Sequence, residues 1–278
     1  MVGYIPSPEH GTIGIGPLEL HAYGLMLAIG VLVAAKIADI RWRQSGHENS
    51  KVIAEIAVPV VVCGVIGARI YHLFTGYKWS ESGIAGAFEI WKGGLSIWGA
   101  VAGGLIAVVV ISRRRHLDTL ALLDAIGPAV VAAQAIGRWG NWFNQELFGK
   151  PSKLPWALEI DLAHRPLGYE LTKTFQPTFL YESIWCLIVF GTIVWLEHNR
   201  GLVKGQAFAL YVAMYTFGRI FFEWMRVDPA SKLFGIRFNL LLSVALCVGA
   251  SVWFVRLGRT HKPDPLTALP GEDQGSSG

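Results

Sequence analysis

Ionisable and amide side chains recur at helical spacing within apolar stretches of this sequence. One set, spaced i, i+3 and i+7, consists of Arg138, Asn141 and Gln145. A second set, spaced i, i+4, i+8 and i+11, consists of Tyr215, Arg219, Glu223 and Arg226. Such spacing places the members of each set on one face of a helix.

The arginines of these sets indicate a site for an anion. Ionisable groups at membrane depth are costly and usually face an internal cavity. A guanidinium group binds phosphate through two parallel hydrogen bonds and keeps its charge. Arg138 and Arg219, with their amide, tyrosine and carboxylate neighbours, therefore predict a site for a phosphate-bearing lipid.

The alternative is that the arginines reach lipid head groups or form ion pairs. Their possible partners are Glu146, Glu182 and Glu223. This alternative has most force for Arg69 and Arg226, which lie near the ends of predicted spans. Glu223 is also four residues from Arg219, a spacing that favours a pair on one helix.

The composition requires lipid around the elements that carry these residues. Of 278 residues, 53% are hydrophobic and 16% are charged, whereas soluble domains carry roughly 25% charged residues. A net charge of +4 gives no reason to expect a nucleic-acid partner. A transmembrane span needs about 20 mostly apolar residues. Seven stretches are long enough: 18–38, 52–74, 94–112, 119–137, 177–196, 205–223 and 238–257.

We therefore expect an all-α, polytopic membrane protein with seven transmembrane helices. One catalytic domain is expected over residues 1–261, with a connection over about 138–177 and a disordered tail over 262–278. Basic residues are dense in short, acid-poor connections on one side, led by Arg113, Arg114 and Arg115. The positive-inside rule then predicts an outer N-terminus and a cytoplasmic C-terminus.

With this topology, the polar clusters at helix ends all fall at the outer face. The clusters are His21 with Tyr23, Arg69 with Tyr71, Gly93 and Gly94 with Trp98, Arg138 with Asn141, Tyr181 with Glu182, and Tyr215 with Arg219, Glu223 and Arg226. Random placement would scatter them over both faces. The convergence predicts one site on the outer side.

Two glycine pairs have two interpretations. Gly93 and Gly94, and Gly99 and Gly103, allow close approach of helices or loops. The amides of Gly93 and Gly94 could instead line a phosphate pocket at a helix start.

The sequence lacks the motifs of several classes of enzyme. The sequence has no Walker A loop, no His-Glu-x-x-His and no serine-nucleophile elbow. Its three cysteines lie far apart in apolar runs, which is not the spacing of a disulfide framework or a metal site. We expect neither a metal nor a cofactor.

Residues 137–149, GRWGNWFNQELFG, resemble the signature of the phosphatidylglycerol–prolipoprotein diacylglyceryl transferase family. Four further stretches resemble the same family in the same order: 21–25, 93–96, 176–182, and 215–226 with its Tyr, Arg, Glu and Arg. The likeness extends over residues 18–257.

The resemblance implies a reaction, its partners and its place in the cell. Members transfer the diacylglyceryl group of phosphatidylglycerol to the thiol of the lipobox cysteine in a prolipoprotein signal peptide. A thioether forms and glycerol phosphate leaves. The family uses no cofactor, has seven membrane helices, and works at the outer leaflet of the bacterial plasma membrane.

The resemblance also assigns residues. Arg138 and Arg219 are expected to stabilise the departing phosphate, with Tyr23 and Tyr215 as functional tyrosines. Signature positions that shape the site are Asn141, Asn144, Glu146 and Gly149. Glu223 is expected to position Arg219. The remaining candidates for substrate binding are Gly93, Gly94, Trp98, Tyr181, Arg226 and Arg69.

One residue departs from the family pattern. In many members a histidine, a proposed general base, follows Gly-Gly-x-Ser-x, but this sequence has Trp98 there. His21 is one substitute. The other possibility is that a thiol beside Arg138 ionises without a base, because nearby cations favour thiolate. Outside this family, a lipid or anion transporter is the rival hypothesis, and a seven-helix receptor is a third.

Overall fold

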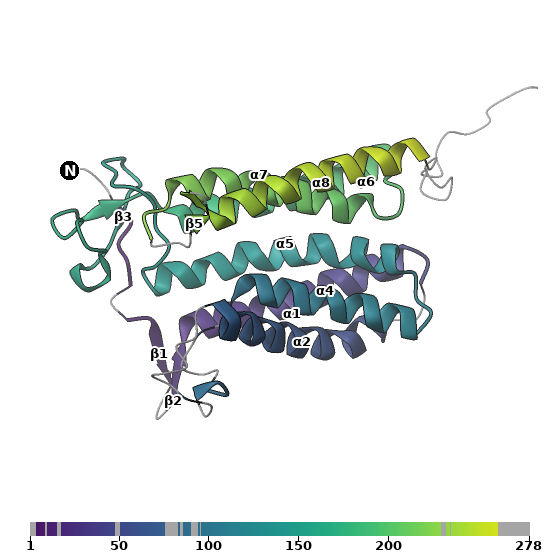
Figure 1. Cartoon of the computed structure of the whole chain (residues 1–278), viewed down its shortest axis with the longest axis horizontal. Helices are drawn as coiled ribbons and strands as arrows, with labels where there is room; N and C mark the ends of the chain where they lie inside the picture. Colours follow the sequence, from purple (N-terminus) through teal and green to yellow (C-terminus); the bar gives the residue numbers. More distant parts are fainter. Residues whose placement is uncertain are drawn as a thin grey trace, which may run out of the picture. The chain divides into compact units, whose positions relative to one another are not determined.

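The computed structural model describes residues 4–8, 10–15, 18–47, 51–75, 83, 86–89, 94, 96–228, 232–233 and 235–260. Gly93 and the predicted tail over 262–278 lie outside these residues. Seven long helices account for most of the described chain (Figure 1): α1 (Ala22–Gln44), α2 (Val52–Thr75), α4 (Ile97–Arg114), α5 (Thr119–Phe143), α6 (Thr178–Arg200), α7 (Gln206–Met225) and α8 (Phe238–Thr260). The predicted helical class is confirmed.

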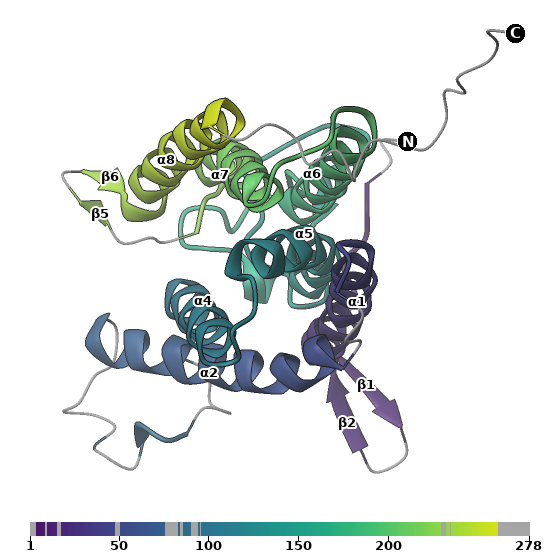
Figure 2. The ribbon, with the colours of Figure 1, turned by 90° about the vertical axis from the view of Figure 1, so that its right-hand side faces the viewer.

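In the part of the chain that the structure describes, three short antiparallel strand pairs accompany the helices. They pair β1 (Thr12–Ile15) with β2 (Leu18–His21), β3 (Leu158–Glu159) with β4 (Thr174–Phe175), and β5 (Lys232–Leu233) with β6 (Ile236–Arg237). The β1–β2 hairpin projects from the start of α1 (Figure 2), with Thr12 opposite His21. A single turn of 3-10 helix, Leu162–His164, lies between β3 and β4.

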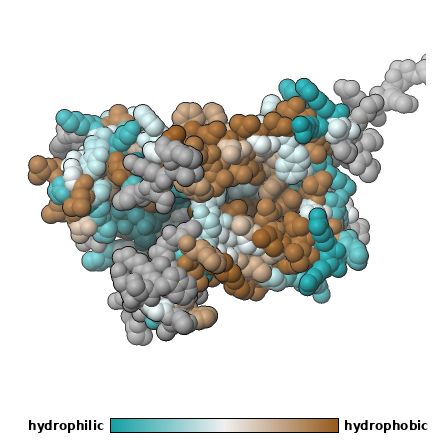
Figure 3. Space-filling model, in the orientation of Figure 1, coloured by the Kyte–Doolittle hydropathy of each residue, from teal (hydrophilic) through white to brown (hydrophobic). Residues whose placement is uncertain are grey.

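Six of the long helices in the described chain are apolar enough to cross a membrane: α1, α2, α4, α5, α6 and α8. Hydrophobic residues cover the helices, and hydrophilic residues gather toward the helix ends (Figure 3). The chain is therefore a polytopic membrane protein. The seventh helix, α7, contains Arg219 and Glu223, which lower its mean hydropathy. Its predicted span over 205–223 stays a prediction.

One predicted boundary and one predicted helix face are wrong. The helix α5 continues to Phe143, so Arg138 and Asn141 are helical and do not belong to the following connection. Gln145 lies beyond the helix end with a φ of 50°. The expected face of Arg138, Asn141 and Gln145 therefore stops at Asn141, because a residue with positive φ cannot continue a right-handed helix.

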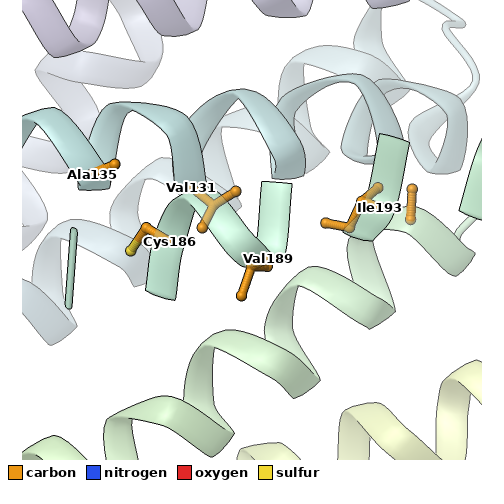
Figure 4. Packing of buried hydrophobic residues seen from close by; sticks show 6 residues of the cluster. Val131, Ala135, Cys186, Val189 and Ile193 are labelled. Atoms are coloured by element: carbon orange, nitrogen blue, oxygen red, sulfur yellow. The ribbon is translucent and has the colours of Figure 1, made fainter. Parts of the chain in front are cut away.

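The chain packs as two compact units, residues 1–34 with 126–278, and residues 35–125. One buried hydrophobic cluster of the first unit lies between α5, α6 and α7. It consists of Val131, Ala135, Cys186, Val189, Ile193 and Ala207 (Figure 4). Trp185 of α6 donates its indole N–H to the Met214 carbonyl at 3.0 Å. Its ring fills the space beside Gly218, where a Cβ atom would lie 2.2 Å from the indole nitrogen.

Close backbone contact between α2 and α4 dominates the second unit. A Cβ atom on Gly99 would lie 2.2 Å from the Gly67 carbonyl oxygen, and one on Gly103 would lie 2.3 Å from the Cys63 carbonyl oxygen. Small residues at this spacing are the usual means of bringing membrane helices together. The packing interpretation of Gly99 and Gly103 is thus confirmed.

Replacing Gly99 with alanine should weaken this helix pair, because the methyl group has no space beside Gly67. Overpacking of this kind costs about 1–3 kcal/mol. Thermal unfolding of the purified protein in detergent should show a lower midpoint for Gly99→Ala. The matched control is Gly104→Ala, where the nearest atom to the new methyl group is Val60 Cγ1 at 3.8 Å. Equal midpoints for the two variants would contradict this account.

Candidate active site

One buried carboxylate joins the two arginines that the sequence singled out. Glu182, in the second turn of α6, lies 2.6 Å from Arg138 Nη2 through Oε2. Arg219 Nη1 lies 3.3 Å from both oxygens of the same carboxylate. Arg138 comes from the last turns of α5 and Arg219 from those of α7. The structure therefore brings both guanidinium groups to one oxygen atom.

The three side chains differ in their access to solvent or lipid. The side chain of Glu182 is 4% exposed, whereas those of Arg138 and Arg219 are 17% and 13% exposed. Among the described residues, the Nε atoms of both arginines have no hydrogen-bond partner. Each guanidinium is thus held by an ion pair with a carboxylate. Its Nε donor stays available for an incoming anion.

A second carboxylate fixes Arg219 from its own helix. Glu223 Oε2 accepts a hydrogen bond from Arg219 Nη2 at 2.8 Å, and Oε1 accepts one from Arg237 Nε at 2.7 Å. Arg226 Nη1 is 3.8 Å from the same carboxylate, whose side chain is fully buried. The predicted pairing of Arg219 with Glu223 is confirmed. A buried carboxylate with several cationic partners is a strong constraint on their geometry.

Sequence reasoning missed two members of this network. Arg237, at the end of β6, donates to Asp228 Oδ2 at 3.2 Å, and Arg226 donates to Asp228 Oδ1 at 2.6 Å. The two missed residues, Arg237 and Asp228, do not share a helical repeat with Arg219 of α7. The available signal was position: Arg237 directly precedes the apolar run of α8, at a predicted membrane boundary.

Hydrogen bonds also link Arg138 to the segment that follows α5. Its Nη1 donates to Asn141 Oδ1 at 3.3 Å, and its Nη2 lies 3.4 Å from the Tyr215 hydroxyl. The Asn141 amide in turn donates to Glu146 Oε1 at 2.8 Å, and Asn144 donates to the same oxygen at 3.4 Å. The signature residues therefore form a continuous hydrogen-bonded chain from Arg138 to Glu146.

The two candidates at the start of α1 have different surroundings. The ring of Tyr23 packs against Gly140, where a Cβ atom would lie 2.5 Å from the ring. His21, at the end of β2, is exposed, and its ring has no hydrogen bond or ion pair with a described residue. The structure thus packs Tyr23, but not His21, against the helix that carries Arg138.

Gly149 and Tyr181 organise the edge of this region. The Gly149 amide donates to the Gln176 carbonyl at 2.9 Å, and a Cβ atom on Gly149 would lie 2.7 Å from Gln176 Cβ. The Tyr181 hydroxyl donates to Gln176 Oε1 at 2.8 Å and accepts from Trp156 at 2.9 Å. Both residues therefore anchor the segment before α6, and neither forms a hydrogen bond to Arg138 or Arg219.

Arg69, Gly94 and Trp98 belong to the second unit. Arg69 donates to the backbone carbonyls of Gly86, Ala87 and Gly94 at 2.6, 2.8 and 3.1 Å. Gly94 has a φ of 75°, and a Cβ atom there would lie 2.7 Å from Arg69 Nη1. Arg69 thus anchors the chain before α4. Trp98 is half-buried in the first turn of that helix.

Comparisons with known proteins identify the family. Residues 11–256 match the family model for prolipoprotein diacylglyceryl transferase. Three relatives, all named phosphatidylglycerol–prolipoprotein diacylglyceryl transferase, come from Frankia alni, Streptomyces coelicolor and Cutibacterium acnes. They are 44%, 41% and 40% identical over 94%, 100% and 96% of this chain, and over 69%, 94% and 91% of their own lengths. This chain therefore belongs to the prolipoprotein diacylglyceryl transferase family.

Proposed function

We propose that this chain transfers the diacylglyceryl group of phosphatidylglycerol to the thiol of the lipobox cysteine in a prolipoprotein signal peptide. The names of the relatives support the substrates and the reaction. The observation that carries the proposal is the meeting of Arg138 and Arg219 at Glu182. The family match favours this activity over the transporter and receptor hypotheses.

The reaction explains why two guanidinium groups are needed. The cysteine sulfur forms a bond to the terminal glycerol carbon of the diacylglyceryl group, and the bond from that carbon to the phosphate oxygen breaks. The electron pair stays on the oxygen, so the leaving phosphate gains one negative charge. Arg138 and Arg219 face this growing charge, which stabilises the transition state more than the bound lipid.

The remaining candidates take supporting roles in this proposal. Glu223 positions Arg219, while Tyr215 and Asn141 fix the guanidinium of Arg138. Asn144, Glu146, Gly149 and Tyr23 shape the site beside Arg138. Tyr181 and Arg226 help to receive the head group. The candidates Arg69, Gly93, Gly94 and Trp98 stay predictions from the sequence.

The proposal includes a topology. Seven spans, with α7 among them, put the N-terminus outside and the C-terminus in the cytoplasm, and put the site at the outer leaflet of the plasma membrane. The basic connection at Arg113, Arg114 and Arg115 supports the cytoplasmic side. Prolipoproteins reach that leaflet with their signal peptides in the membrane, where the lipid substrate is also present.

Removing a phosphate-binding guanidinium should reduce thioether formation strongly. We expect Arg138→Ala to lose on the order of 10²-fold in kcat, or about 3 kcal/mol of transition-state stabilisation. The assay uses purified protein in detergent, phosphatidylglycerol and a lipobox peptide. Arg115→Ala is the control, since Arg115 forms an exposed ion pair with Glu55. Full activity of Arg138→Ala, or no product from the unchanged protein, would refute the proposal.

The topology can be tested with single cysteines in intact cells. The three native cysteines are first replaced by alanine, and activity is confirmed. Lys173→Cys, in the connection before α6, should react with a membrane-impermeant maleimide, because its side chain is 60% exposed. Arg115→Cys, 45% exposed, should react only after permeabilisation. The opposite pattern would reverse the proposed orientation.

A further inference from the structure

Glu146 differs from the other carboxylates near the two arginines. Glu182, Glu223 and Asp228 each form an ion pair with an arginine. Glu146 is half-buried. Within the described chain, its carboxylate accepts hydrogen bonds only from two neutral side-chain amides, those of Asn141 and Asn144. Both amides donate to Oε1, so Oε2 has no partner among these residues. A carboxylate held in this way keeps one oxygen available to accept a proton.

The backbone around Glu146 adopts an unusual conformation. Gln145 and Leu147, on either side, have φ values of 50° and 58°. Such values are uncommon for residues other than glycine, and this chain has glycine at neither position. Strained backbone of this kind persists only where the surrounding structure enforces it, and it clusters at functional sites. The two left-handed residues turn the chain so that Glu146 faces the amides of Asn141 and Asn144.

Contacts on both sides enforce this turn. Gln145 donates to Asp161 Oδ2 at 2.5 Å and accepts from the Asp161 amide at 2.8 Å. Its side-chain nitrogen also donates to the Pro8 carbonyl at 3.1 Å. On the other side, the Thr178 hydroxyl donates to the Leu147 carbonyl. The N-terminal segment, the connection before α6 and the first residue of α6 thus fix the backbone on both sides of Glu146.

One amide sets the place of Glu146 relative to the phosphate site. Asn141 accepts from Arg138 Nη1 at 3.3 Å and donates to Glu146 Oε1 at 2.8 Å. In the reaction, the carbon that the thiol attacks is bonded to a phosphate oxygen. A group that takes the thiol proton must therefore lie beside the guanidinium that binds the phosphate. Glu146 is separated from that guanidinium by one hydrogen-bonded side chain, Asn141.

We propose that Glu146 is the general base of the transfer, an inference that rests on the proposed function. Its carboxylate accepts the proton of the lipobox thiol, and the sulfur electron pair forms the bond to the glycerol carbon. The bond from that carbon to the phosphate oxygen breaks, and its electron pair leaves with glycerol phosphate. Protonated Glu146 then gives its proton to the departing phosphate or to water, which restores the carboxylate.

The other candidates for this step are weaker. The Trp98 indole carries an N–H donor and no basic nitrogen, so the residue at the expected histidine position cannot accept the proton. His21 has a basic nitrogen, but it lies exposed at the end of β2 without a described contact to Arg138 or Glu146. Both of these observations favour Glu146.

The decisive experiment is the pH dependence of Glu146→Gln, measured as kcat in detergent with phosphatidylglycerol and a lipobox peptide. The amide keeps the shape of the side chain and an oxygen for Asn141 but accepts no proton. We expect kcat at pH 7 to fall about 10²-fold or more. It should then rise roughly tenfold per pH unit toward the substrate thiol's pKa of about 8.5, because hydroxide supplies the thiolate. The KM for phosphatidylglycerol should stay unchanged.

Further variants separate a chemical role from a structural one. Glu146→Asp should recover part of the activity, and formate should restore activity to Glu146→Ala. Glu159→Gln is the matched control, because this carboxylate of the same connection pairs with Lys173 and should be dispensable. A loss in Glu146→Gln that is equal at all pH values, or activity equal to that of the unchanged protein, would overturn the assignment. If the unchanged protein forms no thioether, the proposed function itself fails.

Discussion

The ion pairs of Glu182 with Arg138 and Arg219 hold two positive charges beside each other. Without a carboxylate between them, the guanidinium groups would repel and turn away in a medium of low dielectric constant. The arrangement depends on three helix ends, of α5, α6 and α7, that lie at one level in the first unit. Gly140 and Gly218 support it, because each admits an aromatic ring where a side chain would clash.

Buried charge of this kind costs stability, so its retention needs a functional reason. In the proposed reaction, the leaving phosphate supplies one. The phosphodiester of the bound lipid carries one negative charge, and the glycerol phosphate that leaves carries two. Preorganised guanidinium groups act most strongly on the charge that develops. In the proposed mechanism, the carboxylates paired with the arginines limit their attraction for the bound lipid and keep the donors in place. In this proposal Glu146, which has no cationic partner among the described residues, is the carboxylate suited to proton transfer.

The sequence predicted the features that follow from local spacing and hydropathy. The helices over six apolar stretches, the pairing of Arg219 with Glu223 and the close approach at Gly99 belong to this class. The shared role of Glu182 was not predicted, because it depends on how α6 lies between α5 and α7. The contacts of Arg237 were missed for the same reason: they link residues that share no helical repeat. The error at Gln145 arose where a signature motif continued past the helix end.

A structure with bound phosphatidylglycerol tests the central claim most directly. We predict a phosphate within hydrogen-bond distance of both Arg138 and Arg219, on the side of the guanidinium groups that faces away from Glu182. The terminal glycerol carbon should then lie toward Glu146. A phosphate that contacts only one of the two arginines, or that binds elsewhere while both arginines keep only their carboxylate partners, would contradict the account.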